Sequence, residues 1–387
     1  MLIQATVDCP IHDSFRVRQL AGMFDVPMRQ RAVENFSAEI PGPEEPWTIG
    51  LIVGPSGSGK TTIARKAFGD AIVARPIWPD DCAIIDAIGD GPIQHLVGAL
   101  SAVGFSSPPD WLKPYRVLSN GQQFRADLAR ALLSSAELVV FDEFTSVVDR
   151  TVAKVAAYAT SKAVRTGNFC KRFVAVSCHD DVKQWLEPDW VLNLAPDQRA
   201  QRGSAPMARH ERAQRVEWGR LRRPPIAITV RPAVRSAWEL FKRHHYLSAK
   251  LAPAVRCFAG YIEDRIAVFT AVISQTNNAR TDWREHRTVC LPDFQGIGVG
   301  NAMSEFIAGA CAATGRDFRS TTGHPAMIRH RLRSPLWTLV RAPGHGNAFD
   351  RRFRHCGRAS SASRLTASFQ YIGPKHPEAA RCLGLIT

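Results

Sequence analysis

The fold of the N-terminal half is decided by one stretch, Gly54-Pro55-Ser56-Gly57-Ser58-Gly59-Lys60-Thr61-Thr62. It follows an apolar run at 47–54 that predicts a buried strand, and it opens a helical stretch at 61–68. A strand, a glycine-rich loop and a helix in this order form the P-loop pattern. The glycines let backbone N–H groups curl around phosphates, Lys60 reaches the β- and γ-phosphates, and the Thr61 hydroxyl binds Mg²⁺. The stretch therefore predicts a site for a nucleoside triphosphate and Mg²⁺.

Two more apolar runs, at 136–144 and 172–178, predict buried strands because they are short, rich in Val and Phe, and not alternating. Helical stretches separate the three runs, so we expect an α/β fold with a parallel sheet. The second run ends in two acids. Asp142 would hold the Mg²⁺ shell, and Glu143 would polarise an attacking water as a general base.

The segment Leu118-Ser119-Asn120-Gly121-Gln122-Gln123 precedes a helical stretch and lies shortly before the second strand. It resembles the signature motif of the ATP-binding-cassette (ABC) ATPases, with Asn120 where that family usually has Gly. The resemblance implies that the nucleotide is ATP. It also implies that Ser119, Gly121 and Gln122 bind the γ-phosphate held by a second copy, so that ATP drives homodimerisation through this domain.

Three further segments resemble family motifs in the family's order. Ser146-Val-Val-Asp149 is similar to the D-loop, which implies that Asp149 contacts nucleotide. Ser177-Cys-His179-Asp follows the third strand and is similar to the segment of the switch histidine, which implies a catalytic role for His179. Phe24 lies where the family places an aromatic ring that stacks on adenine, although a core Phe is the competing interpretation.

A transport role is the less favoured alternative. No run of 18–20 apolar residues is present, which predicts no membrane span. Only 57 residues separate Lys60 from Leu118, which is short for the subdomain that grips membrane helices in transporters. We therefore favour a non-transport ABC ATPase over the ATP-binding subunit of a transporter. The nine cysteines are scattered without a Cys-x-x-Cys pair, which favours the cytoplasm.

The charge of the chain is uneven. Residues 1–195 carry 19 Lys+Arg and 22 Asp+Glu, whereas residues 196–387 carry 31 and 13, so the C-terminal part has a net charge of +18. Most of its basic residues are arginine, whose planar fork suits phosphates and base edges. We expect a nucleic-acid partner, DNA rather than RNA, although a solvated basic surface in an arginine-rich proteome is the alternative.

The C-terminal part contains a second glycine loop, Gln295-Gly296-Ile297-Gly298-Val299-Gly300, between a strand that includes Val289 and Leu291 and an amphipathic helix at 298–314. This resembles motif A of the GNAT acyltransferases, a superfamily of N-acetyltransferases. The resemblance implies that the loop cradles the pyrophosphate of acetyl-CoA or another acyl-CoA. It also implies that the strand pairs with the pantetheine arm. A glycine turn that only packs a helix on a strand is the competing interpretation.

Acyl transfer needs a base for the amine proton and an acid for the departing thiolate. The candidates are His245, Tyr246, Glu285 and His324. His244 to Ser248 resembles a segment of Mom-type GNATs, phage proteins that modify adenine in DNA, at the end of a helix expected from about residue 233. This implies nucleobase modification, but an ordinary helix end explains the segment equally well.

Together these patterns predict an ABC ATPase domain at 1–198, a basic linker at 199–225 with one helix near 207–220, and an α+β GNAT-like acyltransferase domain at 226–387. Acylation of a nucleobase is the favoured function. Acylation of a protein or small amine, and a nucleic-acid-binding module with an inactive GNAT fold, remain open. Acetyl-CoA binding distinguishes the last alternative from the others.

Overall fold

The computed structural model describes residues 1–10, 12–26, 31–42, 44–73, 76–167, 169, 172–194, 214–219, 225–245, 250–277, 280–345 and 365–386. The chain divides into two compact units. The first contains Met1–Pro76, Ala131–Val148 and Ser161–Arg223, and the second contains Ile77–Arg130, Asp149–Thr160 and Pro224–Thr387. The predicted start of the C-terminal domain at 226 falls close to the last of these junctions, but the second unit also takes up residues from the N-terminal half.

A six-stranded sheet forms the centre of the first unit, in the order β4-β5-β6-β3-β7-β9. All of its pairs are parallel except β7 with β9. The strands are β3 (Ile49–Val53), β4 (Ile72–Val73), β5 (Leu138–Phe141), β6 (Arg172–Ser177), β7 (Trp190–Asn193) and β9 (Glu217–Trp218). The three predicted strands are therefore confirmed as β3, β5 and β6, which lie side by side.

Helices complete this unit. They include α2 (Lys60–Phe68), the last five residues of α7 (Arg150–Arg165) and α8 (Lys183–Leu186). The core joins Ile63 and Ala64 of α2 to Val140, Val174 and other residues of the sheet. Because β3 is buried at all five positions, its sequence is apolar without alternation, as expected for a central parallel strand.

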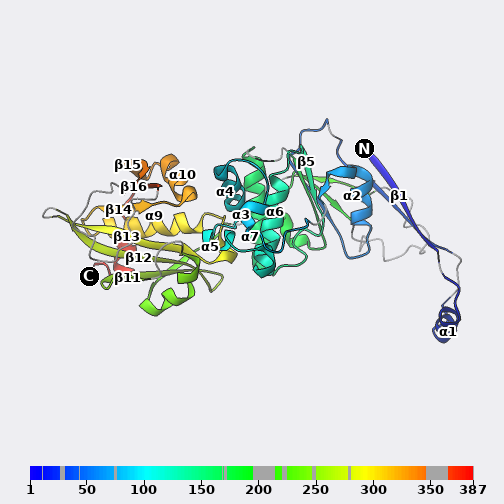
Figure 1. The fold of residues 1–387 in the computed structure, drawn as a ribbon, viewed down its shortest axis with the longest axis horizontal. Helices are drawn as coiled ribbons and strands as arrows, with labels where there is room; N and C mark the ends of the chain where they lie inside the picture. The colour runs from blue at the N-terminus through cyan, green and yellow to red at the C-terminus, as the bar shows by residue number, and fades with distance from the viewer. Residues whose placement is uncertain are drawn as a thin grey trace. The chain divides into compact units, whose positions relative to one another are not determined.

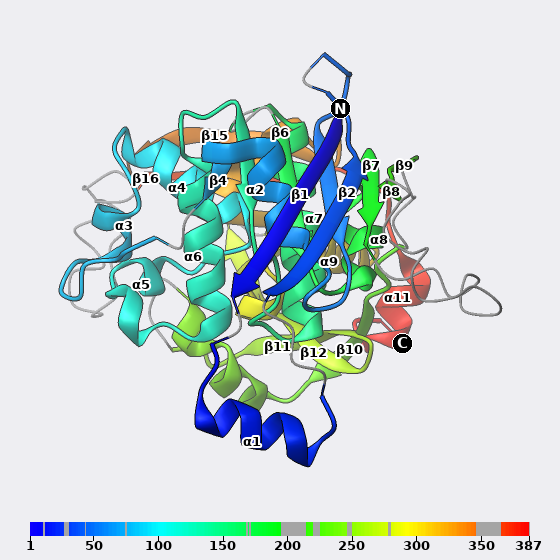
Figure 2. The same ribbon diagram turned by 90° about the vertical axis from the view of Figure 1, so that its right-hand side faces the viewer.

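A smaller sheet in the same unit has the order β1-β2-β8. β1 (Leu2–Pro10) and β2 (Arg31–Glu39) pair antiparallel along their whole length, and β8 is Gln214–Arg215. Helix α1 (Phe15–Met23) follows β1 and has no buried residue. Figure 2 shows β1 and β2 side by side, with α1 beyond the far ends of both strands.

The second unit begins with a helical segment. It contains α3 (Ile84–Ala87), α4 (Ile93–Ala102), α5 (Pro108–Trp111), a 3-10 turn (Tyr115–Val117) and α6 (Asn120–Leu132), of which the residues to Arg130 belong to this unit. Trp78 stacks on Tyr115, and both side chains donate hydrogen bonds to the Asp127 carboxylate, at 2.7 and 2.8 Å. These bonds connect the start of the segment to the middle of α6.

A seven-stranded sheet with the order β10-β11-β12-β13-β14-β16-β15 forms the C-terminal part (Figure 1). The strands are β10 (Thr229–Ala233), β11 (Val255–Ile262), β12 (Arg265–Asn277), β13 (Arg280–Cys290), β14 (Phe318–Thr322), β15 (Trp337–His345) and β16 (Leu365–Tyr371). Neighbours pair antiparallel except β13 and β14, which are parallel and pair only at two positions, Trp283 with Phe318 and Arg284 with Arg319. These two strands therefore share a ladder only near Arg284.

Three helices cover one face of this sheet: α9 (Val299–Ala312), α10 (Pro325–Arg333) and α11 (Pro377–Cys382). Their apolar residues, such as Ile307 and Ala380, join Phe318, Trp337 and Phe369 of the sheet in one core. A smaller core lies around Trp238, Phe241 and Phe269. Nowhere in the described parts of the chain is a helix long and apolar enough to cross a membrane.

Two sequence-based expectations for helices are wrong. The helix expected from residue 233 is replaced by two 3-10 turns, Arg235–Leu240 and Lys242–His244. The described end of the helix expected near 207–220 is extended instead, as β8 and β9. In both segments, pairing with a neighbouring sheet or packing of large aromatic residues outweighs a weak helical preference.

Candidate functional site

The P-loop connects β3 to α2 in the first unit. Gly57 and Gly59 adopt φ angles of 79° and 81°, a left-handed conformation that glycine takes without steric cost. Lys60 is 9% exposed, and its Nζ donates to the Pro55 carbonyl at 2.7 Å. The Ser58 hydroxyl is buried and has no hydrogen-bond partner among the described residues. A loop with a buried lysine and an unsatisfied hydroxyl fits a bound phosphate.

The side chains of Thr61 and Asp142 form a hydrogen bond within the first unit. The Thr61 hydroxyl donates to Asp142 Oδ1 at 3.2 Å, and the backbone N–H of Glu143 donates to the same oxygen at 2.9 Å. A hydroxyl and a carboxylate are the oxygen ligands that Mg²⁺ takes alongside phosphate oxygens. The two residues predicted as metal ligands therefore lie within reach of one ion.

Glu143 and His179 lie at the same edge of the sheet. The P-loop follows β3, Asp142 and Glu143 follow β5, and His179 follows β6, and these three parallel strands are neighbours. The carboxyl ends of parallel strands meet at one edge, where open α/β sheets bind their ligands. Glu143 is exposed and has a φ angle of 53°, which turns the chain sharply after the buried strand.

Ser119 caps α6 in the second unit. Its backbone N–H donates to Gln122 Oε1 at 3.0 Å, and the Gln122 N–H donates back to Ser119 Oγ at 3.4 Å, which is a capping box. Gln122 also donates to Asp110 at 2.9 Å. Ser119 and Asn120 are exposed, so the start of this 13-residue helix presents the Ser119 hydroxyl at a helix N-terminus, a position that suits an anion.

Asp149 caps the next long helix, α7. Its Oδ1 accepts from the N–H groups of Thr151 and Val152 at 2.9 and 3.2 Å. Arg265, from the turn between β11 and β12, donates to Thr151 Oγ1 at 2.5 Å and lies 3.9 Å from Asp149 Oδ1. The exposed Asp149 is therefore fixed at a helix start, which is compatible with the D-loop resemblance.

Two curated proteins with similar sequences are named as ATP-binding proteins. The cytochrome c biogenesis ATP-binding export protein CcmA of Rhodospirillum rubrum is 28% identical over 166 residues, which cover 34% of this chain and 68% of that protein. The zinc import ATP-binding protein ZnuC of a Jannaschia species is 30% identical over 146 residues, which cover 33% of this chain and 60% of that protein. The chain carries an ABC ATPase-like domain. ATP is the ligand that its P-loop fits.

Two further matches are a curated protein and a solved structure. The mRNA export factor elf1 of Schizosaccharomyces pombe is 30% identical over 136 residues, which cover 29% of this chain and 13% of that protein. A solved bacterial ABC transporter cassette, described as dimeric, aligns with 50% of this chain and 94% of its own length at 15% identity, with a TM-score of 0.37. No protein-family model matches the chain.

Phe24 has no visible place in the ATP site of the ABC ATPase-like domain. It ends α1 and is 68% exposed, and α1 lies beyond the ends of β1 and β2 (Figures 1 and 2). The aromatic ring that touches the P-loop belongs to Phe36 of β2, because a Cβ added to Gly59 would lie 2.4 Å from that ring. A role for Phe24 with adenine stays a prediction. Phe36 was missed because its strand has no motif.

Gln295 and Gly296, predicted to hold a pyrophosphate, pack against the helical segment of the same unit. Gln295 is 7% exposed, accepts from the Ser106 N–H at 2.7 Å and donates to the Cys290 carbonyl at 3.0 Å. A Cβ on Gly296 would lie 2.6 Å from Gly104 Cα. The first half of this glycine loop is thus occupied by protein contacts, which the loop sequence did not reveal.

The second half of the loop is more open. Gly298 has a φ angle of 89° and no atom within 4 Å of an added Cβ, and α9 begins at the next residue. Gly300 lies against Cys290 Sγ. The other four residues predicted to contact acyl-CoA have core or sheet roles: Ile297 and Val299 in the core under α9, Val289 in the smaller core, and Leu291, whose N–H bonds the Ala267 carbonyl.

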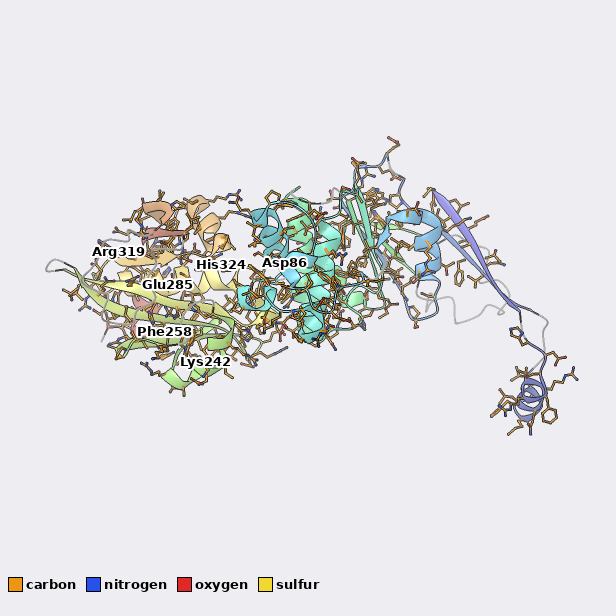
Figure 3. The ribbon with its side chains drawn as sticks, in the orientation of Figure 1. Asp86, Lys242, Phe258, Glu285, Arg319 and His324 are labelled. Atoms are coloured by element: carbon orange, nitrogen blue, oxygen red, sulfur yellow. The ribbon has the colours of Figure 1, made fainter. Side chains whose placement is uncertain are left out.

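Glu285 is not the available base that its sequence position suggested (Figure 3). Its carboxylate accepts from Thr288 at 2.6 Å, Ser304 at 2.8 Å and Arg331 at 2.7 Å, and also from Ser320. Burial alone would raise the pKa of Glu285, but Arg331 and the hydroxyl groups outweigh it and hold the pKa below its usual range. All four partners donate to the ionised form, so Glu285 is a structural anion.

Two of the remaining catalytic candidates, His324 and His245, lie within the described residues. His324 precedes α10, and burial lowers its pKa, although a hydrogen bond to the backbone of Ser106 opposes the shift. A neutral imidazole at neutral pH results. The His245 ring lies edge-on to Trp238, with 5.7 Å between ring centroids. Tyr246 lies outside the described residues, so its role stays a prediction.

Proposed function

We propose that the chain binds and hydrolyses ATP at the edge formed by β3, β5 and β6. The observation that carries this proposal is the meeting of Thr61 and Asp142 beside Lys60 and Glu143. Lys60 would neutralise the β- and γ-phosphates, and the P-loop N–H groups would orient them. Mg²⁺, when bound, supplies charge neutralisation at the phosphates. Glu143, exposed beside this edge, would accept the proton of the attacking water.

The proposed active form is a homodimer in which Ser119 of one copy completes the site of the other. The exposed, capped start of α6 supports this assignment, because a hydroxyl at a helix N-terminus suits a γ-phosphate. Since P-loop and signature motif come from different copies in this proposal, ATP is the ligand that joins them.

Phosphate release by the purified chain tests the ATPase proposal. Glu143→Gln removes the general base, and we expect turnover to fall by roughly 100-fold or more. Glu137→Gln is the matched control, because Glu137 is exposed at the opposite end of β5 and carries the same charge. Equal turnover in wild type and Glu143→Gln, with the control unchanged, would reject the proposed base.

For the C-terminal part we propose a GNAT-like domain that acts on nucleic acid. The order of its seven strands, the parallel β13–β14 pair that separates after Arg284, and α9 between these strands support the GNAT likeness. The favoured activity is acyl transfer to a nucleobase amine. A new C–N bond replaces the thioester C–S bond, and the amine proton leaves with the thiol.

A second candidate is a nucleic-acid-binding domain without transferase activity. The contacts of Gln295 and Gly296 with Gly104–Ser106 favour it, because the same loop would have to receive the pyrophosphate. The Glu285 carboxylate also favours this candidate, because it already accepts hydrogen bonds from Ser304 and Arg331. Under this proposal the domain couples the binding of nucleic acid to the hydrolysis of ATP.

Coenzyme A binding, measured by calorimetry, separates the two candidates. The first predicts binding by wild type and its loss in Gly298→Glu, which places a carboxylate at the open half of the loop. The second predicts no heat from either protein. Mass spectrometry of nucleosides from cells that express each protein then identifies any modified base.

A further inference from the structure

One half of the C-terminal sheet has a polar face opposite its helices. Along β14 the residues alternate: Phe318 and Ser320 are buried toward α9 and the core, while Arg319 and Thr321 are exposed. β13 and β16 follow the same alternation, with Trp283 and Phe369 on the core side. We call the exposed side of these strands and β15 the arginine face. Figure 3 labels Arg319 on it.

The register places the members of the arginine face in rows. Arg284 of β13 pairs with Arg319 of β14, Arg319 pairs with Gln370 of β16, and Gln370 pairs with Thr338 of β15. The next row joins Thr321, Ser368 and Arg341. Neighbouring strands lie about 4.8 Å apart, so these side chains form a continuous surface.

Two arginines directly opposite each other are unfavourable, because like charges on paired strands repel. Neighbouring side chains of the sheet reduce this charge repulsion only in part. Asp282 lies 3.3 Å from Arg319, and Gln275 accepts from Arg284 at 3.2 Å. Burial lowers the pKa of Arg284, and no acidic group counters the shift. Of the acidic groups in the described residues, Asp282 is placed against this face, and its printed ion pair is with Arg319.

We propose that the arginine face binds single-stranded nucleic acid through its phosphates. This inference rests on the proposed function and deepens it by naming the surface that holds the partner. Phosphates between Arg284 and Arg319 would relieve their repulsion, and both guanidinium groups can give paired hydrogen bonds. The Thr321, Ser368, Gln370 and Thr338 side chains supply neutral donors on both sides.

The composition of the face also sets the kind of recognition. The rows contain no Phe, Tyr or Trp that would stack on bases, so phosphate contacts dominate and binding is independent of sequence. A flexible single strand can follow a twisted sheet, whereas a rigid duplex touches it along a line. The net charge of +18 in residues 196–387 adds long-range attraction.

Fluorescence anisotropy with a labelled oligo-dT of about 20 nucleotides tests the proposal on the full-length chain. We expect Arg284→Ala/Arg319→Ala to weaken binding by tenfold or more at about 0.1 M salt. The slope of log affinity against log salt should fall by about 1.4, because each lost contact to a single strand removes about 0.7. The control is Arg329→Ala/Arg381→Ala, which removes the same charge from exposed sites on α10 and α11.

The outcomes distinguish an error in the arginine face from an error in the proposed nucleic-acid partner. If wild type and control bind while the face variant binds equally well, the arginine face is wrong and nucleic-acid binding stands. If wild type binds no oligonucleotide, the proposed partner itself fails. Tighter binding of a duplex of the same length would contradict the single-stranded assignment. Thermal melting checks folding, and Arg284→Gln/Arg319→Gln repeats the test with smaller changes in side-chain shape.

Discussion

At the scale of residues, Glu285 and Arg331 form a deeply buried ion pair. Arg331 is almost wholly buried, donates to the Glu285 carboxylate at 2.7 Å and lies over the Trp337 ring, 4.3 Å from its centroid. A buried ion pair of this kind is satisfied only as long as both partners are present. The pair joins β13 to α10 behind the separated strands, so it sets the geometry of any site there.

Arg331→Leu should therefore destabilise the protein by about 3–5 kcal/mol, because it leaves the Glu285 carboxylate buried with hydroxyl partners alone. Urea unfolding measures the change. Arg333→Leu is the control, since Arg333 is exposed at the end of the same helix. A loss below about 1 kcal/mol for Arg331→Leu would contradict the structural role assigned to this pair.

The two left-handed glycines of the P-loop allow a second comparison. Both resist an Ala side chain through their φ angles, but only Gly59 also faces the Phe36 ring. Gly59→Ala should thus lower ATP affinity more than Gly57→Ala, since a displaced Phe36 or loop disturbs the phosphate cradle. Titration with a fluorescent ATP analogue measures both. Equal losses would contradict the contact between Phe36 and the loop.

At the scale of elements, a buried arginine of the helical segment contacts the C-terminal glycine loop. Arg125 of α6 is 1% exposed and donates to the Pro292 carbonyl at 2.6 Å, while its Nε and Nη2 atoms have no hydrogen-bond partner among the described residues. Burial lowers the pKa of Arg125 to about 10, although Asp293 and Asp149 oppose the shift. It stays charged at neutral pH in a costly position.

Replacing Arg125 tests what this link does. Arg125→Met keeps the volume and removes the buried charge, so we expect little loss of stability. We also expect faster hydrogen exchange at 292–296, because the bond to Pro292 is lost. Arg116→Met, at an exposed arginine before the same helix, should change neither. Unchanged exchange in Arg125→Met would mean that Arg125 does not hold the loop.

Sequence patterns predicted the elements that depend on residues close together in the sequence. β3, β5 and β6 read as buried strands, and Thr61 and Asp142 met as their motifs implied. The contacts of Gln295 with Ser106 and the partners of Glu285 were not predictable, because they join residues that are far apart in sequence and belong to no motif. The prediction of a helix from residue 233 was wrong because aromatic packing replaced helical hydrogen bonds.

At the scale of the whole molecule, we propose different roles for the two ends of the chain. The ABC ATPase-like domain contributes the P-loop and its acids from an almost neutral sequence, and the basic C-terminal part would contribute the proposed face for nucleic acid. The proposed dimerisation would connect them, since each ATP would need Lys60 from one copy and Ser119 from another. Two damaged copies should therefore complement each other.

Hydrolysis by a mixture of Lys60→Ala and Ser119→Arg proteins tests this central claim most directly. Each variant alone should be inactive, because every site then lacks one essential group. In an equal mixture about half of the dimers are mixed, and each has one intact site, so we expect roughly a quarter of the wild-type rate. A mixture as inactive as its components, or full activity of Ser119→Arg alone, would contradict the shared site.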